Sequence, residues 1–296
     1  MPLFFFLSGY VTYQPIKKQS FVDLRKQIKK KILGLMIPTV VIISVAAYIH
    51  TNTIERVLFD PMKIGYWFTF VLFQIFILYY FVKFVTDKYL SNTGETGIFL
   101  FIILISYILS NFRFYLDISW IKILSFSQVI SYTQFFFIGL LAKKYQNKFV
   151  KLCTKQALIT FLFMVFVILF YLNGDKEFLF YKVTYYILVY CTLFLVFILF
   201  YNYQSFFSSY TPIGKGLIYI GQHTLEIYFL HYFFLFKLPE LALYFNDCPE
   251  NCVLMILTTV VLSVIIIVFC LLTMKIINIV KPVSFLLFGP AKKIKK

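Results

Sequence analysis

The stretch VLMILTTVVLSVIIIVFCLLTMK, residues 253–275, decides the fold class of this 296-residue protein. Its first 22 residues carry no charge, and about 20 apolar residues in a helix are enough to cross a membrane. Hydrophobic residues make up 61% of the whole chain and charged residues only 14%, whereas a soluble domain is nearer half apolar and a quarter charged. The sequence therefore predicts a polytopic helical membrane protein.

Eight further segments of the chain have a similar apolar character. The nine expected spans lie at 2–16, 33–51, 64–83, 97–112, 123–142, 156–172, 179–201, 217–236 and 253–275. The first is short, and the apolar segment 282–289 is too short to cross, so we expect it at the interface. The sequence shows no repeat and no soluble domain. We therefore expect an all-α transmembrane bundle that forms one membrane domain over residues 1–296.

The basic residues indicate which side of the membrane each connection faces. If the loop 17–31 is cytoplasmic, the segments on that side carry 21 of the 28 Lys and Arg residues. Cytoplasmic loops of membrane proteins show this excess, so the net charge of +16 marks topology and contact with anionic lipids, not a nucleic-acid partner. The C-terminus is then cytoplasmic. Nine spans place the N-terminus outside, and a further helix ahead of Met1 would return it to the cytoplasm.

Five segments, in the same order along the chain, resemble motifs of one membrane-protein family. They are MPLFFFLSGY (1–10), FVDLRKQIKKKILGLMIPT (21–39), YWFTFVLFQIFILYY (66–80), QFFFIGLLAKKYQNKF (134–149) and YIGQHTLEIYFLHYFF (219–234). Each match is weak alone, because Phe-rich runs are common in membranes, but the shared order makes the set specific. The chain up to about residue 236 is similar to membrane-bound acyltransferase family 3, whose members acylate bacterial surface polysaccharides and other sugars.

The resemblance implies that the chain is an enzyme, an integral O-acyltransferase of the plasma membrane. It implies transfer of an acyl group, expected to be acetyl, from acyl-CoA to a hydroxyl of a surface polysaccharide or sugar precursor. Acyl-CoA is then a co-substrate, and we expect no bound cofactor or metal. In the family, a helix with a catalytic His precedes the segment that resembles MPLFFF. We therefore expect this chain to be N-terminally truncated, with ten spans in the full-length family, and impaired in catalysis.

Two alternatives remain open at this point. A transporter or flippase would also combine apolar helices with a few buried polar groups, although transporters commonly show an internal duplication that this sequence does not clearly have. A non-catalytic remnant of the family would keep the motifs without the activity. The substitution His231→Ala should lower the activity of an enzyme more than that of a transporter.

Acyl transfer needs a general base, and histidine has the appropriate pKa for this role. His231 belongs to the late motif and is the first catalytic candidate, and Glu226, the one acidic residue within a span, is the second. Ionisable groups at membrane depth are costly and indicate function. The alternative for His231 is a neutral imidazole hydrogen-bonded between helices, and for Glu226 a carboxyl group that is protonated or paired with a neighbour such as Lys or Tyr. His223 shares a helix face with Glu226, and we favour a structural pair. His50 is expected at the interface.

The candidates for substrate binding are Trp67, Arg113 and Ser8. Trp67 is also explained as an interfacial aromatic residue. Arg113 could be a snorkelling anchor or could hold an anionic sugar group. Ser8 and Gly9 are also explained as small residues that allow helices to approach closely. Arg25, Lys26 and Lys29 are candidates for the phosphates of acyl-CoA, or serve only as the positive-inside signal. Cys248 and Cys252, in the loop NDCPENC, could form a local disulfide or remain thiols.

Overall fold

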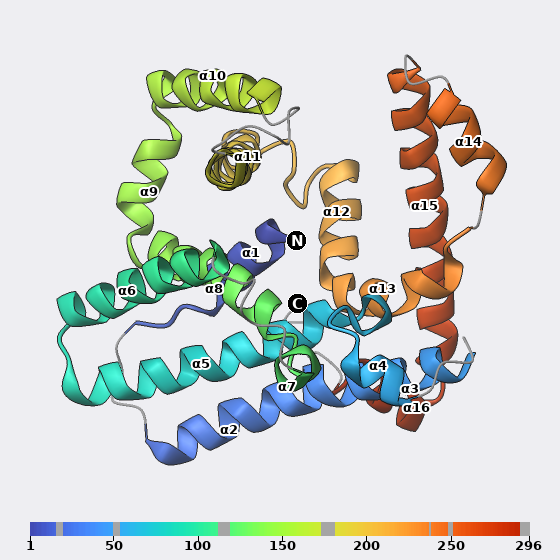
Figure 1. Ribbon diagram of the computed structural model, residues 1–296, viewed down its shortest axis with the longest axis horizontal. Coiled ribbons are helices and arrows are strands. Elements are labelled where there is room, and N and C mark those ends of the chain that lie inside the picture. Colours follow the sequence, from blue (N-terminus) through green and yellow to red (C-terminus); the bar gives the residue numbers. More distant parts are fainter. Residues whose placement is uncertain are drawn as a thin grey trace.

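The computed structural model describes residues 1–15, 20–49, 54–111, 119–172, 181–236, 238–247 and 251–290 (Figure 1). Every regular element in these ranges is helical, which confirms the predicted all-α class. The longer helices are α1 (Pro2–Thr12), α2 (Phe21–Lys31), α3 (Ile37–Ile49), α5 (Trp67–Tyr89), α6 (Asn92–Asn111), α8 (Phe126–Lys144), α10 (Gln156–Leu172), α11 (Tyr181–Asn202), α12 (Pro212–Gln222) and α15 (Cys252–Ile277). The shorter ones are η1 (Ile32–Met36), α4 (Ile54–Phe59), η2 (Lys63–Gly65), α7 (Ser119–Ile123), α9 (Gln146–Cys153), α13 (Thr224–Leu230), η4 (His231–Phe234), α14 (Pro239–Asp247) and α16 (Lys281–Phe288).

Helices α1, α5, α6 and α8 enclose the main core, and the close crossing of α1 and α8 is its tightest contact. A Cβ atom added to Gly9 of α1 would overlap the backbone oxygen of Phe136, and one added to Gly139 of α8 would overlap that of Phe6. Only glycine fits at both positions. Gly9 thus lets two helices approach, which is the structural role that the sequence suggests for the Ser8–Gly9 pair.

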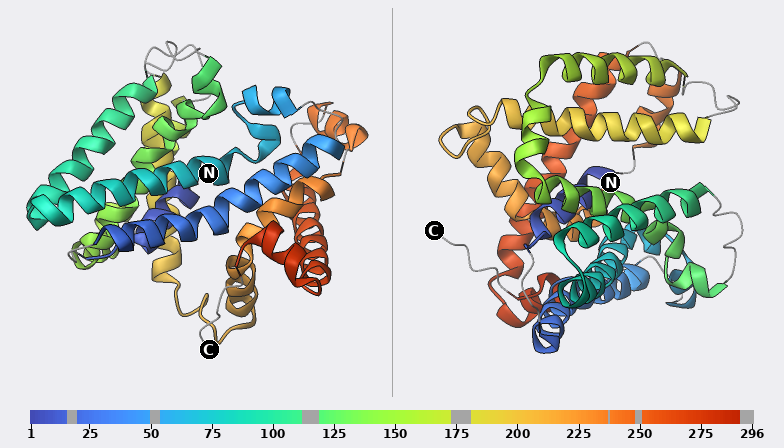
Figure 2. Two further views of the ribbon diagram at one scale, coloured as in Figure 1. Left: turned by 90° about the horizontal axis from the view of Figure 1, so that it is seen from below. Right: turned by 90° about the vertical axis from the view of Figure 1, so that its left-hand side faces the viewer.

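The basic segment from Phe21 to Lys31 is a helix, which corrects the expectation of a loop at 17–31. The Asp23 carboxylate accepts the Ser20 backbone N–H at 3.1 Å, and the Ser20 hydroxyl caps the first turn, so the helix start has its own capping box. Helix α2 continues through the π-helical turn η1 into α3 (Figure 2). It lies beside α5, with the rings of Phe21 and Phe84 6.4 Å apart, and so places basic residues along the C-terminal half of α5.

The expected span 217–236 is broken into α12, α13 and η4. His223 interrupts the helical path with φ −106° and ψ 16°, and the chain tightens into a 3₁₀ turn after Leu230. Helix α13 and η4 pack against α15 and share a second core cluster with it, which includes Phe229, Cys270 and Met274. Helix α15 stands at the edge of the molecule, and most of its residues are exposed (Figure 1).

Fewer helices satisfy the length and hydropathy of a membrane span than the nine that the sequence predicts. Among the described residues, five do: Phe21–Ile49, Trp67–Tyr89, Asn92–Asn111, Val183–Asn202 and Cys252–Ile277. The count becomes six if α9 and α10, which meet at 73°, together form one span. Helix α1 is apolar but has only 11 residues, about 16 Å of helix. A multi-pass membrane protein is supported, and the count of nine stays a prediction.

Candidate functional site

A pocket of about 540 Å³ lies where the N-terminal ends of α5 and α8 meet α1, α6 and α11. This volume is typical of sites for small organic ligands. Trp67, the first residue of α5, is 6% exposed and lies in the pocket wall. The aromatic lining consists of Trp67, Tyr132, Phe135, Tyr185 and Tyr186, and the polar lining of Ser110, Asn111, Ser127, Gln128 and Ser131.

A strained turn places Trp67 at this pocket. Lys63 and Ile64 have φ values of 49° and 55°, which residues other than glycine rarely adopt, and Gly65 has a φ value of 94°. The Asp60 carboxylate holds the turn by accepting the backbone N–H groups of Met62 at 2.9 Å and Ile64 at 3.0 Å. Burial lowers the pKa of the Lys63 ammonium group, although Asp60 acts in the opposite direction. Such strain persists only where the surroundings enforce it.

The late motif, residues 219–234, supplies those surroundings. The Tyr228 hydroxyl donates to the Gly65 carbonyl at 2.9 Å and accepts the Phe68 backbone N–H at 3.2 Å. The Tyr232 hydroxyl also reaches the Gly65 carbonyl, at 3.3 Å, and a Cβ atom on Gly65 would overlap the Tyr232 ring. Gly65 is therefore required both by its φ angle and by this contact. Two sequence motifs that lie about 160 residues apart thus meet at the start of α5.

His231 lies in this motif, next to the residues that precede Trp67. Its Nδ1 atom is 2.7 Å from the Tyr228 carbonyl oxygen, and its ring centroid is 4.0 Å from that of Tyr232. A carbonyl only accepts hydrogen bonds, so Nδ1 carries the hydrogen. In the neutral imidazole, Nε2 is then the basic nitrogen. The half-buried ring is thereby oriented by Tyr228, whose hydroxyl bonds the Gly65 carbonyl, and the lining of the pocket does not include His231.

The carboxylate of Glu226 lies close to the ring of His223. The His223 Nδ1 and Glu226 Oε1 atoms are 3.8 Å apart, beyond hydrogen-bond distance, and both side chains are mostly buried. Five residues along a helix correspond to a rotation of roughly 140°, so Glu226 and His231 face different directions. The structure therefore brings together His223 and Glu226, the pair that the sequence treats as structural.

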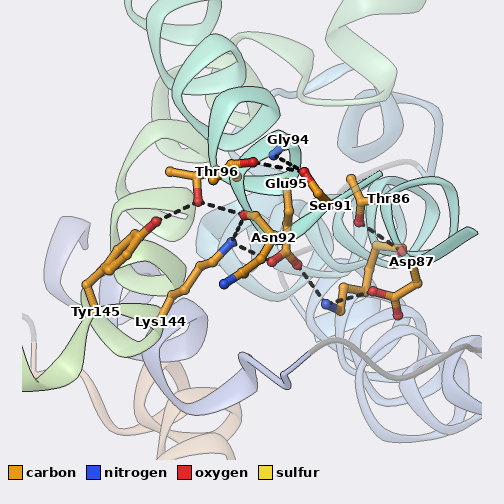
Figure 3. Close-up of polar contacts among 11 residues, drawn as sticks. Thr86, Asp87, Ser91, Asn92, Gly94, Glu95, Thr96, Lys144 and Tyr145 are labelled. Atoms are coloured by element: carbon orange, nitrogen blue, oxygen red, sulfur yellow. Dashed lines mark hydrogen bonds and ion pairs between the residues drawn. The ribbon is translucent and has the colours of Figure 1, made fainter. Parts of the chain in front are cut away.

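The opposite ends of α5 and α8 hold a buried ionic network that the sequence analysis missed (Figure 3). The Lys83 ammonium group is 2.9 Å from Asp87 and 2.7 Å from Glu95, and Lys144 is 2.7 Å from the second Glu95 oxygen. All four side chains are at most 3% exposed. Lys144 also donates to the Asn92 carbonyl at 2.7 Å. Two cations and two carboxylates give the network no net charge.

The proposed acyl-CoA residues Arg25, Lys26 and Lys29 are exposed on α2. Arg25 and Lys29 border a groove of about 360 Å³ with Phe21, Leu24, Ile28 and Ile32. Because α2 lies along α5, this basic face and the ionic network are at the same end of the molecule. The arrangement leaves the three cations available to an anionic ligand.

Several sequence-based candidates are not placed at the pocket. Ser8 is half-buried on α1, and the lining of the pocket does not include it. Arg113, His50 and Cys248 lie outside the described residues, so the proposed roles of Arg113 and His50 and the Cys248–Cys252 pairing stay predictions. Within the described ranges, no group of three or more His, Cys, Asp or Glu side chains could hold a metal ion.

Comparison with known proteins matches the chain to a family. The family model described as an acyltransferase domain matches residues 1–275. No curated protein and no solved structure matches the chain significantly. The matched region includes Trp67, the late motif with His231 and every helix of the main core, and it covers far more than half of the sequence. The chain therefore belongs to the membrane acyltransferase family 3 that its motifs resemble.

Proposed function

We propose that this protein is an integral membrane O-acyltransferase that moves an acyl group, preferentially acetyl, from acyl-CoA to a hydroxyl of a surface polysaccharide or sugar precursor. The observation that carries the proposal is the pocket at Trp67, whose preceding turn is bonded by Tyr228, the residue that orients His231. Family membership supplies the reaction class, acyl transfer. The donor, the acyl chain and the acceptor are the proposed parts.

The reaction breaks the thioester C–S bond of acyl-CoA and forms an ester C–O bond to the acceptor. The acceptor hydroxyl loses its proton as it attacks, and the proton leaves with the thiolate of CoA. His231 is the proposed base, because its hydrogen-bonded Nδ1 leaves Nε2 with a lone pair. Glu226 is the weaker candidate, because its carboxylate lies 3.8 Å from His223, the partner that the sequence treats as structural.

Arg25, Lys26 and Lys29 are proposed to bind the phosphates of acyl-CoA. They lie at the other end of α5 from Trp67. The distance from Trp67 to Lys83 along α5 is about 24 Å, since a helix rises 1.5 Å per residue. Donor and acceptor would then approach from opposite sides of the membrane, as expected if the donor is cytoplasmic and the acceptor lies outside.

The test measures acyl transfer in membrane vesicles that contain the expressed chain. Radiolabelled acetyl-CoA is supplied on the cytoplasmic side, together with a sugar acceptor, and alkali-labile label on the sugar is counted. We expect His231→Ala to lower the transfer rate by about 10²-fold or more, the usual contribution of a general base. Tyr210→Phe, at a side chain that is 91% exposed, is the control.

Each outcome of this assay decides between the candidate functions. Ester formation that depends on His231 supports the acyltransferase and the role of the base. Ester formation that is unchanged in His231→Ala rejects His231 as the base but retains the enzyme. If correctly inserted protein moves the sugar across the vesicle membrane without acylating it, the transporter alternative replaces the proposed function.

A further inference from the structure

Two strained turns lead into α5 and α8, whose first residues line the pocket at Trp67. Among the described residues, three residues other than glycine have a positive φ: Lys63 and Ile64 ahead of α5, and Ser125, at 50°, ahead of α8. The first turn of α8 then supplies Gln128 to the pocket lining. Such backbone conformations cost free energy and cluster at active sites and ligand clamps. The strain is thus a sign, independent of the pocket volume, that a ligand binds here.

The two turns are bonded to each other, which fixes this side of the pocket. The buried Ser125 hydroxyl donates to the Pro61 carbonyl at 2.8 Å. Gln128 lies three residues further along α8 and contacts Met62, which also lines the pocket. The backbone at Gln128 is therefore held by the turn ahead of α5 as well as by its own helix.

The side-chain amide of Gln128, by contrast, makes few of the hydrogen bonds available to it. An amide has two N–H donors and an oxygen with two lone pairs. Among the described residues, Nε2 has only the Met62 sulfur, a weak acceptor, at 3.7 Å, and the buried Oε1 has no hydrogen-bond partner. Within the described part of the lining, this oxygen is the only buried side-chain polar atom without a partner. Such a group costs free energy unless a ligand or water completes its bonds.

Two other glutamines in the same helices have partners. The Nε2 atom of Gln134 on α8 donates to the Ser131 carbonyl at 2.9 Å, and its Oε1 atom accepts the Tyr190 hydroxyl at 2.5 Å. Gln74 on α5 donates to a backbone carbonyl at 2.8 Å. Neither of these glutamines lines the pocket. The glutamine in the lining, Gln128, is thus the one whose amide the fold leaves largely unused.

We infer that Gln128 is an acceptor-binding residue, whose amide forms hydrogen bonds with a hydroxyl group of the acceptor. A hydroxyl group both donates and accepts, so it suits either end of an amide. The last torsion of a glutamine side chain is broad, so a rotation about it turns the buried Oε1 from the protein towards a ligand. The inference rests on the proposed function, since it names a residue that positions the hydroxyl-bearing substrate. Gln128 has no part in the proton transfer.

A single substitution separates a role in binding from a role in folding. Gln128→Met keeps the approximate length and volume of the side chain and removes the amide. Because the fold leaves this amide largely unused, the thermal unfolding midpoint of the purified full chain in nanodiscs should stay equal or rise. The affinity for the acceptor should fall about three- to tenfold, the usual contribution of one hydrogen bond.

Gln74→Met is the matched control. The same substitution there removes a hydrogen bond that the fold uses, at a position outside the pocket lining. We expect a lower unfolding midpoint and an unchanged affinity, which is the reverse of the result expected for Gln128→Met.

Trp67 reports binding in the absence of any reaction. The chain has two tryptophans, so Trp120→Phe leaves Trp67 as the single fluorophore, in the wall of the pocket. This chain is titrated with the methyl glycosides of glucose, galactose, mannose and N-acetylglucosamine, and then with the monodeoxy derivatives of the tightest ligand. Loss of the hydroxyl that Gln128 binds should weaken binding to the parent chain but not to Gln128→Met. Loss of any other hydroxyl should affect both chains equally.

Three results would overturn the inference. The first is that Gln128→Met binds the glycosides as tightly as its parent. The second is that it fails to fold or has an unfolding midpoint as low as that of Gln74→Met, which would show that the amide serves the fold. The third is that none of the four glycosides gives a saturable change in fluorescence.

Binding is measured without acyl-CoA, so this inference and the proposed function fail in different ways. Glycoside binding that depends on Gln128, without ester formation in the vesicle assay, would support the binding role and reject the enzymatic function. Ester formation with the same KM for the acceptor in Gln128→Met and its parent would support the enzyme and reject the role of Gln128.

Discussion

At the scale of single residues, the glycines at the crossing of α1 and α8 carry a clear stability prediction. We expect Gly9→Ala to destabilise the protein by about 1–3 kcal/mol, because its methyl group would overlap the Phe136 backbone and overpacking costs this much. Unfolding by a denaturing detergent in mixed micelles measures the change. Gly97→Ala is the control, since a Cβ atom at that exposed helical position meets no atom within 4 Å. Equal stability of the two variants would refute the close crossing.

Glu95 carries the second residue-scale prediction. Replacing it with Gln leaves Lys83 and Lys144 buried with only Asp87 to balance them, and removal of one member of a buried pair costs about 3–5 kcal/mol. We expect a loss of this size in the same unfolding assay. The double variant Glu95→Gln with Lys83→Met should lose less than Glu95→Gln alone, because one uncompensated cation is gone. A double variant that loses at least as much would show that charge balance is not the cause.

The sequence predicts some of these residues and not others, for a physical reason. Trp67 and His231 stand out as individual residues in motifs. The structure places Trp67 in the pocket wall and connects His231 to the preceding turn only through Tyr228. The sequence pattern treats Lys83 and Lys144 only as part of the basic excess of cytoplasmic segments, and it gives Glu95 no distinct role. Lys83 and Lys144 pair with Glu95, which lies 12 and 49 positions away from them in the sequence. A sequence pattern does not show which distant residues lie close together in space.

At the scale of elements, the contact of α13 and η4 with the start of α5 carries the third prediction. Tyr228→Phe removes the hydrogen bond to the Gly65 carbonyl and leaves the Phe68 N–H without its acceptor, at a cost of about 1–3 kcal/mol. Since the same contact positions Trp67 and His231, acyl transfer should fall more than the loss of folded protein explains. Rates are therefore divided by the folded fraction and compared with Tyr210→Phe. A normalised rate equal to that of the control would mean that the contact serves stability alone.

Hydropathy predicts the elements well where helices are long and apolar, and less well at their ends and breaks. Residues 253–275 lie within α15, and 64–83 largely within α5. The lysines lower the hydropathy of residues 21–31, so the segment resembles a polar loop, although Ser20 and Asp23 form a recognisable helix cap. The break at His223 changes backbone direction without changing apolar content, so the same residues resemble one continuous span.

At the scale of the whole molecule, the two polar regions lie at opposite ends of the same two helices. Helix α5 carries Trp67 at its start and Lys83 near its end, and α8 carries Ser127 at its start and Lys144 at its end. Residues 127 and 144 are about 25 Å apart along α8, close to the roughly 30 Å hydrocarbon thickness of a membrane. The pocket and the network are therefore expected at opposite faces of the bilayer. From the excess of lysine and arginine in the segments on that side, we expect the network to face the cytoplasm.

This orientation is tested by accessibility of single cysteines. In a background without the five native cysteines, Ser127→Cys places a thiol at the pocket and Lys148→Cys places one on the exposed surface of α9, beyond the network. A membrane-impermeant maleimide added to intact cells should label residue 127, because the pocket faces outward, and should label residue 148 only after the membrane is permeabilised. Both must react in detergent, which controls for burial of the thiol. Labelling of residue 148 alone in intact cells would invert the topology. It would then place the proposed acceptor pocket on the cytoplasmic side, where the sugar acceptor would have to be an intracellular precursor.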